Sequence, residues 1–169
     1  MSLFAPTFNN LRDLYLNELR DLYSAEMQLL DALPTMAEAA TSPQLRNAFT
    51  SHLGETQLHV QRLEQIFQGL GEDPSGETCQ AMKGLIKEGE DYVKAGGDDS
   101  VRDAGLIGAA QRVEHYEMAG YGTTRALAMR LNETAAAKTL QTTLDEEGAA
   151  DKKLTTIAEG QVNVAASVS

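Results

Sequence analysis

Glutamate takes the place of an apolar residue near the middle of each of the four long amphipathic helices that the sequence predicts. The four are Glu26, Glu55, Glu114 and Glu147. Burying even one carboxylate in an apolar core costs several kcal/mol. Four carboxylates that face one another cannot all stay ionised unless a cation lies among them. The pattern favours a metal site inside a helix bundle, and the spacing alone leaves open a metal-free bundle with a buried polar network.

The composition favours a single all-helical domain. The chain has 169 residues with 4 prolines, no tryptophan and 5% aromatic residues. This length is enough to bury a core in one domain. The formal net charge of −11 argues against nucleic acid or an anionic membrane as a partner, since both attract basic surfaces.

Cysteine content and hydropathy point to the cytoplasm. Cys79 is the only cysteine, so the chain forms no internal disulfide, and this fits a reducing compartment. The sequence opens without a charged and then apolar leader, and it has no apolar run near the roughly 20 residues that span a bilayer. We therefore expect a cytoplasmic protein that does not enter a membrane.

Apolar periodicity predicts four long helices, at 7–39, 43–68, 100–131 and 134–160. A shorter helix is expected at 79–94, in a crossover long enough for the third long helix to lie parallel to the second. The predicted fold is therefore all-α, a ferritin-like four-helix bundle over 1–160 with a short extra helix in the crossover between helices 2 and 3. The small, polar residues at 161–169 predict a flexible C-terminal tail.

Local signals mark two helix starts and several close contacts. Ser42 as N-cap and Pro43 as first helical residue open the second helix. Ser100 with Asp103 predicts the start of the third long helix. Glycines at 105, 108, 120 and 122 are unusual inside a helix, so we expect a neighbouring helix or subunit to approach closely there.

A dinuclear carboxylate site needs oxygen ligands from several directions and a few nitrogen donors. In ferritin-like bundles two helices each supply one glutamate, and the other two each supply a glutamate with a histidine one turn on. Here the second helix pairs glutamate with histidine four residues later, and the fourth pairs glutamate with aspartate at the same spacing. The predicted ligands are Glu26, Glu55, His59, Glu114, Glu147 and Asp151.

Further side chains compete for places in this site. Glu117 lies one turn beyond Glu114 and is a candidate for an extra, mobile carboxylate. His52 competes with His59 as the nitrogen ligand. His115 lies about 100° round the helix from Glu114, so we expect it outside the ligand set.

Four segments carry a resemblance to a known family. They are DLYSAEMQL at 21–29, HLGET at 52–56, VEHYEMAGYGT at 113–123 and DEEGAADKKL at 145–154. Together they resemble the bacterial YciE/YciF stress-protein family, and the likeness covers nearly the whole chain. The resemblance implies a ferritin-like, rubrerythrin-related bundle with a dinuclear iron site, dimeric and linked to stress. It implies no reaction, because none is established for that family.

The sequence departs from the ferritin-like pattern at two ligand positions. The superfamily has histidine three residues after glutamate on two helices, whereas here four residues separate Glu55 from His59. Asp151 stands where the second histidine is expected. The extra carboxylate makes the site richer in oxygen, which leaves manganese or partial metal occupancy open.

Two functions follow from this reading. In the first, two iron ions per chain, bridged by carboxylates such as Glu55 and Glu147, reduce oxygen or peroxide. In the second, the chain is a non-catalytic helical homodimer that acts in stress through partner binding and holds no metal.

Overall fold

The computed structural model describes residues 6–168, and every regular element in this range is helical. The elements are α1 (Leu11–Ala39), α2 (Pro43–Leu70), α3 (Gln80–Val93), α4 (Asp99–Arg130), α5 (Thr134–Ile157), the π-helical turn η1 (Ala158–Val162) and α6 (Asn163–Ala166). None of these helices is both long and apolar enough to cross a membrane.

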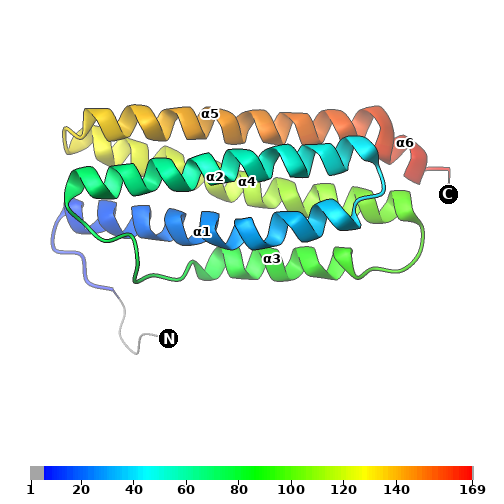
Figure 1. Cartoon of the computed structure of the whole chain (residues 1–169), viewed down its shortest axis with the longest axis horizontal. Coiled ribbons are helices and arrows are strands. Elements are labelled where there is room, and N and C mark those ends of the chain that lie inside the picture. The colour runs from blue at the N-terminus through cyan, green and yellow to red at the C-terminus, as the bar shows by residue number, and fades with distance from the viewer. Residues whose placement is uncertain (1–5, 169) are drawn as a thin grey trace.

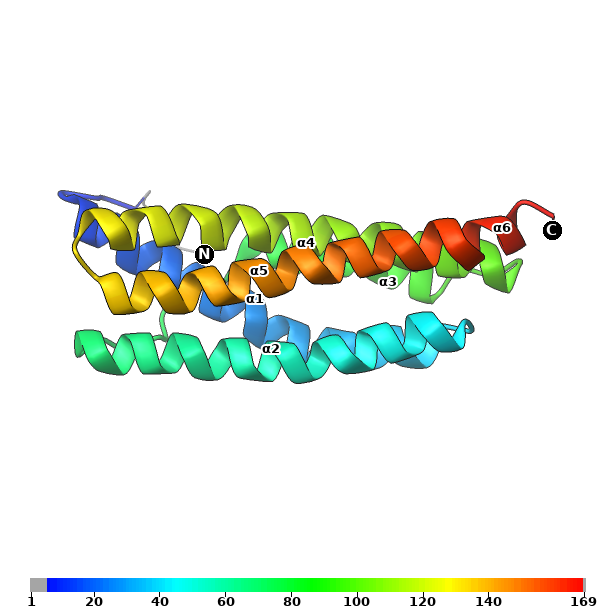
Figure 2. The same cartoon turned by 90° about the horizontal axis from the view of Figure 1, so that it is seen from above.

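Four long helices, α1, α2, α4 and α5, run along the long axis of the molecule (Figures 1 and 2). The connection at 40–42 is short, so α1 and α2 are antiparallel neighbours. The segment containing α3 returns the chain along the length of the bundle, and α3 packs on α1 and α4. As a result α4 runs parallel to α2, as the length of the crossover predicted.

The apolar core is split into two clusters by a polar band. One cluster contains Leu29, Phe49, Leu106 and Leu154. The other contains Leu19, Leu63, Tyr121 and Leu140. On each long helix, buried acidic or histidine side chains fall at or beside the boundary between the two clusters; they are Glu26, His52, His59, Glu114, Glu117 and Glu147. These polar residues therefore lie at similar depth along all four helices.

The second helix begins as the sequence predicted, and the first begins later. The Ser42 hydroxyl accepts a hydrogen bond from the Leu45 N–H at 3.3 Å, with Pro43 in the first turn. The first helix begins at Leu11 rather than near Thr7, because Asn10 accepts from the Asp13 N–H at 3.0 Å and caps it.

The predicted cap of the third long helix is wrong. Asp98, not Ser100, caps α4 by accepting from the Ser100 N–H at 2.8 Å. Asp103 is buried and accepts from the Thr41 N–H at 3.0 Å, the Thr41 hydroxyl at 2.8 Å and the Ser42 N–H at 2.6 Å. Its carboxylate therefore ties the start of α4 to the turn between α1 and α2.

Replacing Asp103 with alanine should lower the free energy of unfolding by about 3 kcal/mol, because partly buried donors lose a charged acceptor. Urea unfolding followed by circular dichroism measures the loss. Asp98→Ala is the matched control, since loss of an N-cap costs about 1 kcal/mol. Equal losses in the two variants would contradict the tying role of Asp103.

The chain stays helical beyond the predicted end at Gly160. Residues 158–162 form a π-helical turn, and α6 continues to Ala166. Val162 is buried in the same apolar cluster as Leu154, which explains why the segment docks instead of leaving the bundle. The predicted tail is thus helical over 161–166, and Ser169 lies outside the described residues.

Two of the four glycines noted in the third long helix sit at close helix contacts. A methyl group on Gly120 would lie 2.8 Å from Cδ2 of Leu22 on α1, and one on Gly105 would meet the ring of Tyr92 on α3. Gly122 has no neighbour within 4 Å of such a methyl group. The expected close approach is therefore confirmed at Gly105 and Gly120.

The Tyr15 hydroxyl is buried with no hydrogen-bond partner, and burial together with Glu133 raises the pKa of Tyr15 to about 12. The unfolded chain ionises near pH 10, so the stability linked to Tyr15 is intact below pH 10 and is lost as pH rises toward 12. Tyr15→Phe should leave stability at pH 7 within about 0.5 kcal/mol of the parent, or raise it. Urea melts between pH 10 and 12 should show a smaller alkaline loss in the variant, and equal slopes would contradict this account.

Candidate metal centre

Six buried side chains from all four long helices meet in the polar band. Four of them, Glu26, His59, Glu117 and Glu147, are 0% exposed. Glu114 and His52 are nearly as deeply buried. Side chains from α1, α2, α4 and α5 therefore converge in the interior, as the sequence pattern required.

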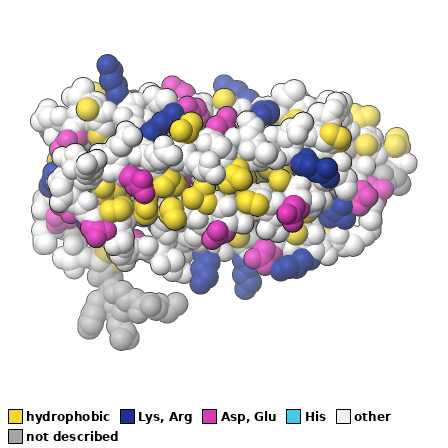
Figure 3. Space-filling view, viewed as in Figure 1, with side chains coloured by type: hydrophobic (Ala, Val, Ile, Leu, Met, Phe, Trp, Pro, Cys, Tyr) yellow, Lys and Arg dark blue, Asp and Glu magenta, His cyan; other side chains and the backbone are white. Residues whose placement is uncertain are grey.

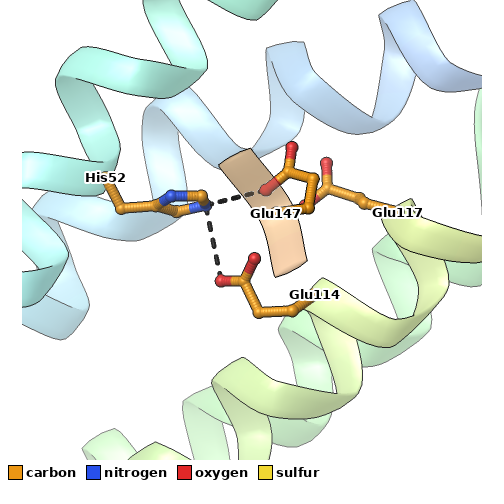
Figure 4. Close-up of side chains that lie close together, drawn as sticks. All are labelled: His52, Glu114, Glu117 and Glu147. Atoms are coloured by element: carbon orange, nitrogen blue, oxygen red, sulfur yellow. Dashed lines mark ion pairs between the residues drawn. The ribbon is translucent and has the colours of Figure 1, made fainter. Parts of the chain in front are cut away.

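The first group of potential ligands joins α2, α4 and α5. His52, Glu114, Glu117 and Glu147 each offer one atom, and these atoms all lie within 4.8 Å of one another. The Nε2 atom of His52 lies 3.4 Å from a Glu114 oxygen and 3.7 Å from a Glu147 oxygen. Figure 4 shows the imidazole of His52 pointing across the bundle at these two carboxylates.

The second group joins α1, α2 and α5 through Glu26, His59 and Glu147. The Nδ1 atom of His59 lies 3.2 Å from a Glu26 oxygen and 3.0 Å from a Glu147 oxygen. The Tyr121 hydroxyl donates a hydrogen bond to Glu26. Glu147 belongs to both groups, so its carboxylate stands between two adjacent positions that could each hold a cation.

Buried polar atoms without a hydrogen bond are concentrated in this band. Among the described residues, twelve buried side-chain nitrogen and oxygen atoms have no hydrogen-bond partner, and eight of them belong to six residues: Glu26, His52, His59, Glu114, Glu117 and Glu147. Buried polar atoms are ordinarily paired, and one left unpaired costs about 1–3 kcal/mol. Cations coordinated by these atoms would satisfy them together, so the donor set fits a metal.

Burial and facing charges raise the pKa values of several side chains in the cluster. Burial raises the pKa of the Glu26, Glu114 and Glu117 carboxyls, and Glu147 adds to the rise in each. Burial opposes protonation of the two histidines, but facing carboxylates outweigh it and raise the pKa of His52 to about 9 and of His59 to about 10. A bound metal must displace these protons.

Through its other ring nitrogen, each histidine also contacts a carboxylate outside the two groups. Nδ1 of His52 lies 3.2 Å from Glu55, and Nε2 of His59 lies 3.0 Å from Glu146. Arg62 donates two hydrogen bonds to Glu146. Metal-binding histidines commonly donate their second N–H to a carboxylate in this way. The arrangement leaves Nε2 of His52 and Nδ1 of His59 facing the interior.

Six of the eight predicted ligands come together, and two do not. The Glu55 side chain is 41% exposed and contacts His52, so of the two carboxylates predicted to bridge only Glu147 belongs to both groups. Asp151 accepts from Gln111 at 3.0 Å and lies 3.4 Å from His115. Both carboxylates would have to rotate inward to reach a cation.

Both histidines that compete as nitrogen ligand, His52 and His59, lie in the cluster, one in each group. The sequence did not identify Glu146 and Arg62 as part of the site. Glu146 precedes Glu147 and faces a different side of α5, so periodicity places it outside the buried stripe. The only available signal was Arg62 three residues after His59, a spacing that puts both on one face of α2.

Fold and site together define the class: an all-helical protein with a buried histidine–glutamate cluster that could hold metal ions. Residues 10–167 match the family described as a domain of unknown function, DUF892, and the chain belongs to this family. Similarity to YciF in sequence and in structure confirms the resemblance to YciE/YciF proteins.

Relatives in sequence and in solved structure support this family assignment. Protein YciF of Escherichia coli (strain K12) is 43% identical over 154 residues, which cover 90% of this chain and 93% of that protein. The crystal structure of the E. coli stress protein YciF superposes with a TM-score of 0.89 at 42% identity, covering 92% of this chain and 99% of that one. YcfI from Rhodopseudomonas palustris gives a TM-score of 0.87 at 46% identity, with the same coverage.

Proposed function

We propose that this chain is a ferritin-like protein that binds two iron ions, with manganese as the alternative metal. One ion would be held by Glu26 and His59, the other by His52, Glu114 and Glu117, with Glu147 shared between them. The observation that carries the proposal is the convergence of eight buried atoms without a hydrogen bond on six metal-ligating side chains; four of these atoms, on Glu26, Glu114 and Glu117, have no ion-pair contact either. Four carboxylates with two imidazoles form an oxygen-rich donor set suited to Fe²⁺ or Mn²⁺.

Bound redox-active ions would supply electrons for the reduction of oxygen or peroxide, which is the activity we propose. The chain's own residues prepare the site for this. The two apolar clusters exclude water on both sides of the polar band. Tyr121 donates a hydrogen bond to Glu26, and Glu55 and Glu146 orient the two imidazoles.

Metal analysis tests the proposal. Protein incubated with Fe²⁺ without oxygen and then desalted should hold about two ions per chain, the number that ferritin-like dinuclear sites bind. The double variant Glu26→Ala, Glu114→Ala removes one ligand from each group and should hold close to none. Glu88→Ala, at an exposed position on α3, is the matched control and should retain the parent's metal. A parent protein that retains no iron or manganese would overturn the proposal.

A second candidate function is metal-free partner binding as a homodimer. The supporting observation is a groove of about 340 Å³ between α1, α3 and α4, lined by apolar residues that include Leu29, Met36, Ile86 and Val93. Figure 3 shows apolar side chains gathered along the middle of this face. The R. palustris relative is provisionally described as a structural protein and the E. coli relative as a stress protein, in keeping with such a role. Light scattering would show a mass of twice 18.3 kDa for the dimer.

A further inference from the structure

A cavity of about 130 Å³ lies between α2 and α5. At its outer end are Ala149 and Lys153, both exposed at the protein surface. At its inner end are the imidazole of His52 and the carboxylate of Glu114, both buried. The cavity therefore connects the surface with the first group of potential ligands.

The cavity reaches one cation position and not the other. His52 and Glu114 line it, and these two face each other in Figure 4. Glu26 and His59, which build the second position, are absent from its lining and are 0% exposed. The two positions thus differ in access from outside, although both use Glu147.

Size and charge limit what can enter. The cavity holds the volume of roughly four water molecules, at about 30 Å³ each. Glu55 is paired with His52 and Glu146 with Arg62, and Lys153 adds a positive charge at the mouth, so the lining carries charges of both signs. The wall includes the small side chains of Ala48 and Ala150, which leave the passage narrow but unblocked.

We propose that this cavity is the entry route by which small neutral molecules, such as dioxygen or hydrogen peroxide, reach the metal, and that they reach it only at the His52–Glu114 position. The inference rests on the proposed function, because it presumes bound metal. It adds that exogenous ligands bind at one end of the centre, while the Glu26–His59 position stays closed.

Nitric oxide, a neutral diatomic molecule, is the probe for the test. Its association with the iron-loaded ferrous protein is followed by stopped-flow absorbance without oxygen. Ala150→Leu adds bulk to the wall and narrows the passage. It should slow the association of nitric oxide at least about tenfold, which corresponds to an added barrier of about 1.4 kcal/mol. The iron content should stay at the parent's value. At saturation the parent should bind about one nitric oxide per chain, since one metal position is open.

Two further variants make the outcome decisive. Ala149→Phe adds bulk at the exposed rim, where folding tolerates it, and should also slow association. Ala135→Leu, exposed on the same helix away from the cavity, should match the parent. Iron-loaded Ala149→Phe and Ala150→Leu that bind nitric oxide at the parent's rate would overturn the route. Two nitric oxides per chain would overturn the single open position, and a protein without iron would overturn the proposed function and the route with it.

Discussion

Loading the protein with Fe²⁺ under anaerobic conditions should raise its unfolding midpoint by roughly 8–16 °C. A ligand that binds only the folded state at about a thousand times its dissociation constant contributes about 4 kcal/mol. In a chain of this size, about 1 kcal/mol shifts the midpoint by about 2–4 °C. The physical source is the set of unpaired carboxylate and imidazole atoms in the polar band, which gain a cation as partner. Calorimetry with and without metal measures the shift.

Glu147→Gln should abolish most of that rise, because Glu147 belongs to both groups of potential ligands. The matched control is Glu88→Gln, an exposed position that should keep the parent's metal-dependent rise. A Glu147→Gln protein with an undiminished rise would show that the cation binds elsewhere.

In the metal-free protein, Glu117→Leu should increase the free energy of unfolding by about 1–4 kcal/mol, the range seen when buried charged groups give way to apolar residues of similar size. Glu117 is 0% exposed, and neither of its carboxylate oxygens has a hydrogen-bond partner. Burial raises the pKa of its carboxyl well above the usual value, and Glu26, Glu147 and Glu114 add to the rise. The Glu117 side chain therefore destabilises the folded state unless a cation is bound.

The same substitution should weaken the stabilisation that metal provides. Glu117→Leu removes a donor from the His52 group, so the metal-loaded variant should gain less stability from Fe²⁺ than the parent. Urea unfolding of both proteins, with and without metal, measures the two effects. Glu88→Leu, an exposed control, should change stability by no more than about 0.5 kcal/mol. Destabilisation of the metal-free Glu117→Leu protein would contradict the account of Glu117 as an unsatisfied acid.

Local sequence signals predicted the helices and their buried faces well wherever the feature depends on residues of a single helix. The Ser42–Pro43 start of α2 needs only its own turn, and the structure contains it. His52 and His59 lie seven residues apart, which is two helical turns, so the apolar stripe placed both inward before any neighbour was known. Periodicity likewise placed Glu26, Glu114 and Glu147 at similar depth.

The same reasoning did not predict the positions of side chains at the edge of a helix's apolar face. The sequence named both Glu55 and Glu117 as candidate ligands, yet Glu117 is fully buried and Glu55 is partly exposed against His52. The difference arises because α1 and α5 pack against α4 and the side chains of His52 and Glu147 lie beside Glu117, whereas Glu55 lines the cavity between α2 and α5. Which edge residue turns inward depends on how neighbouring helices pack, and no single helix contains that information.

The sequence by itself determined the helices, the depth of their acids and the family, because helical period and capping act within a few residues. Only the tertiary structure decided that Asp103 ties α4 to the turn at 40–42, that Glu146 and Arg62 hold His59, and that 161–166 continue as helix. Most of these contacts join residues more than 50 positions apart, and the terminal helix docks on a distant surface. Which acid contacts which partner is determined when the helices pack, because several acids along a helix have the same local helix propensity.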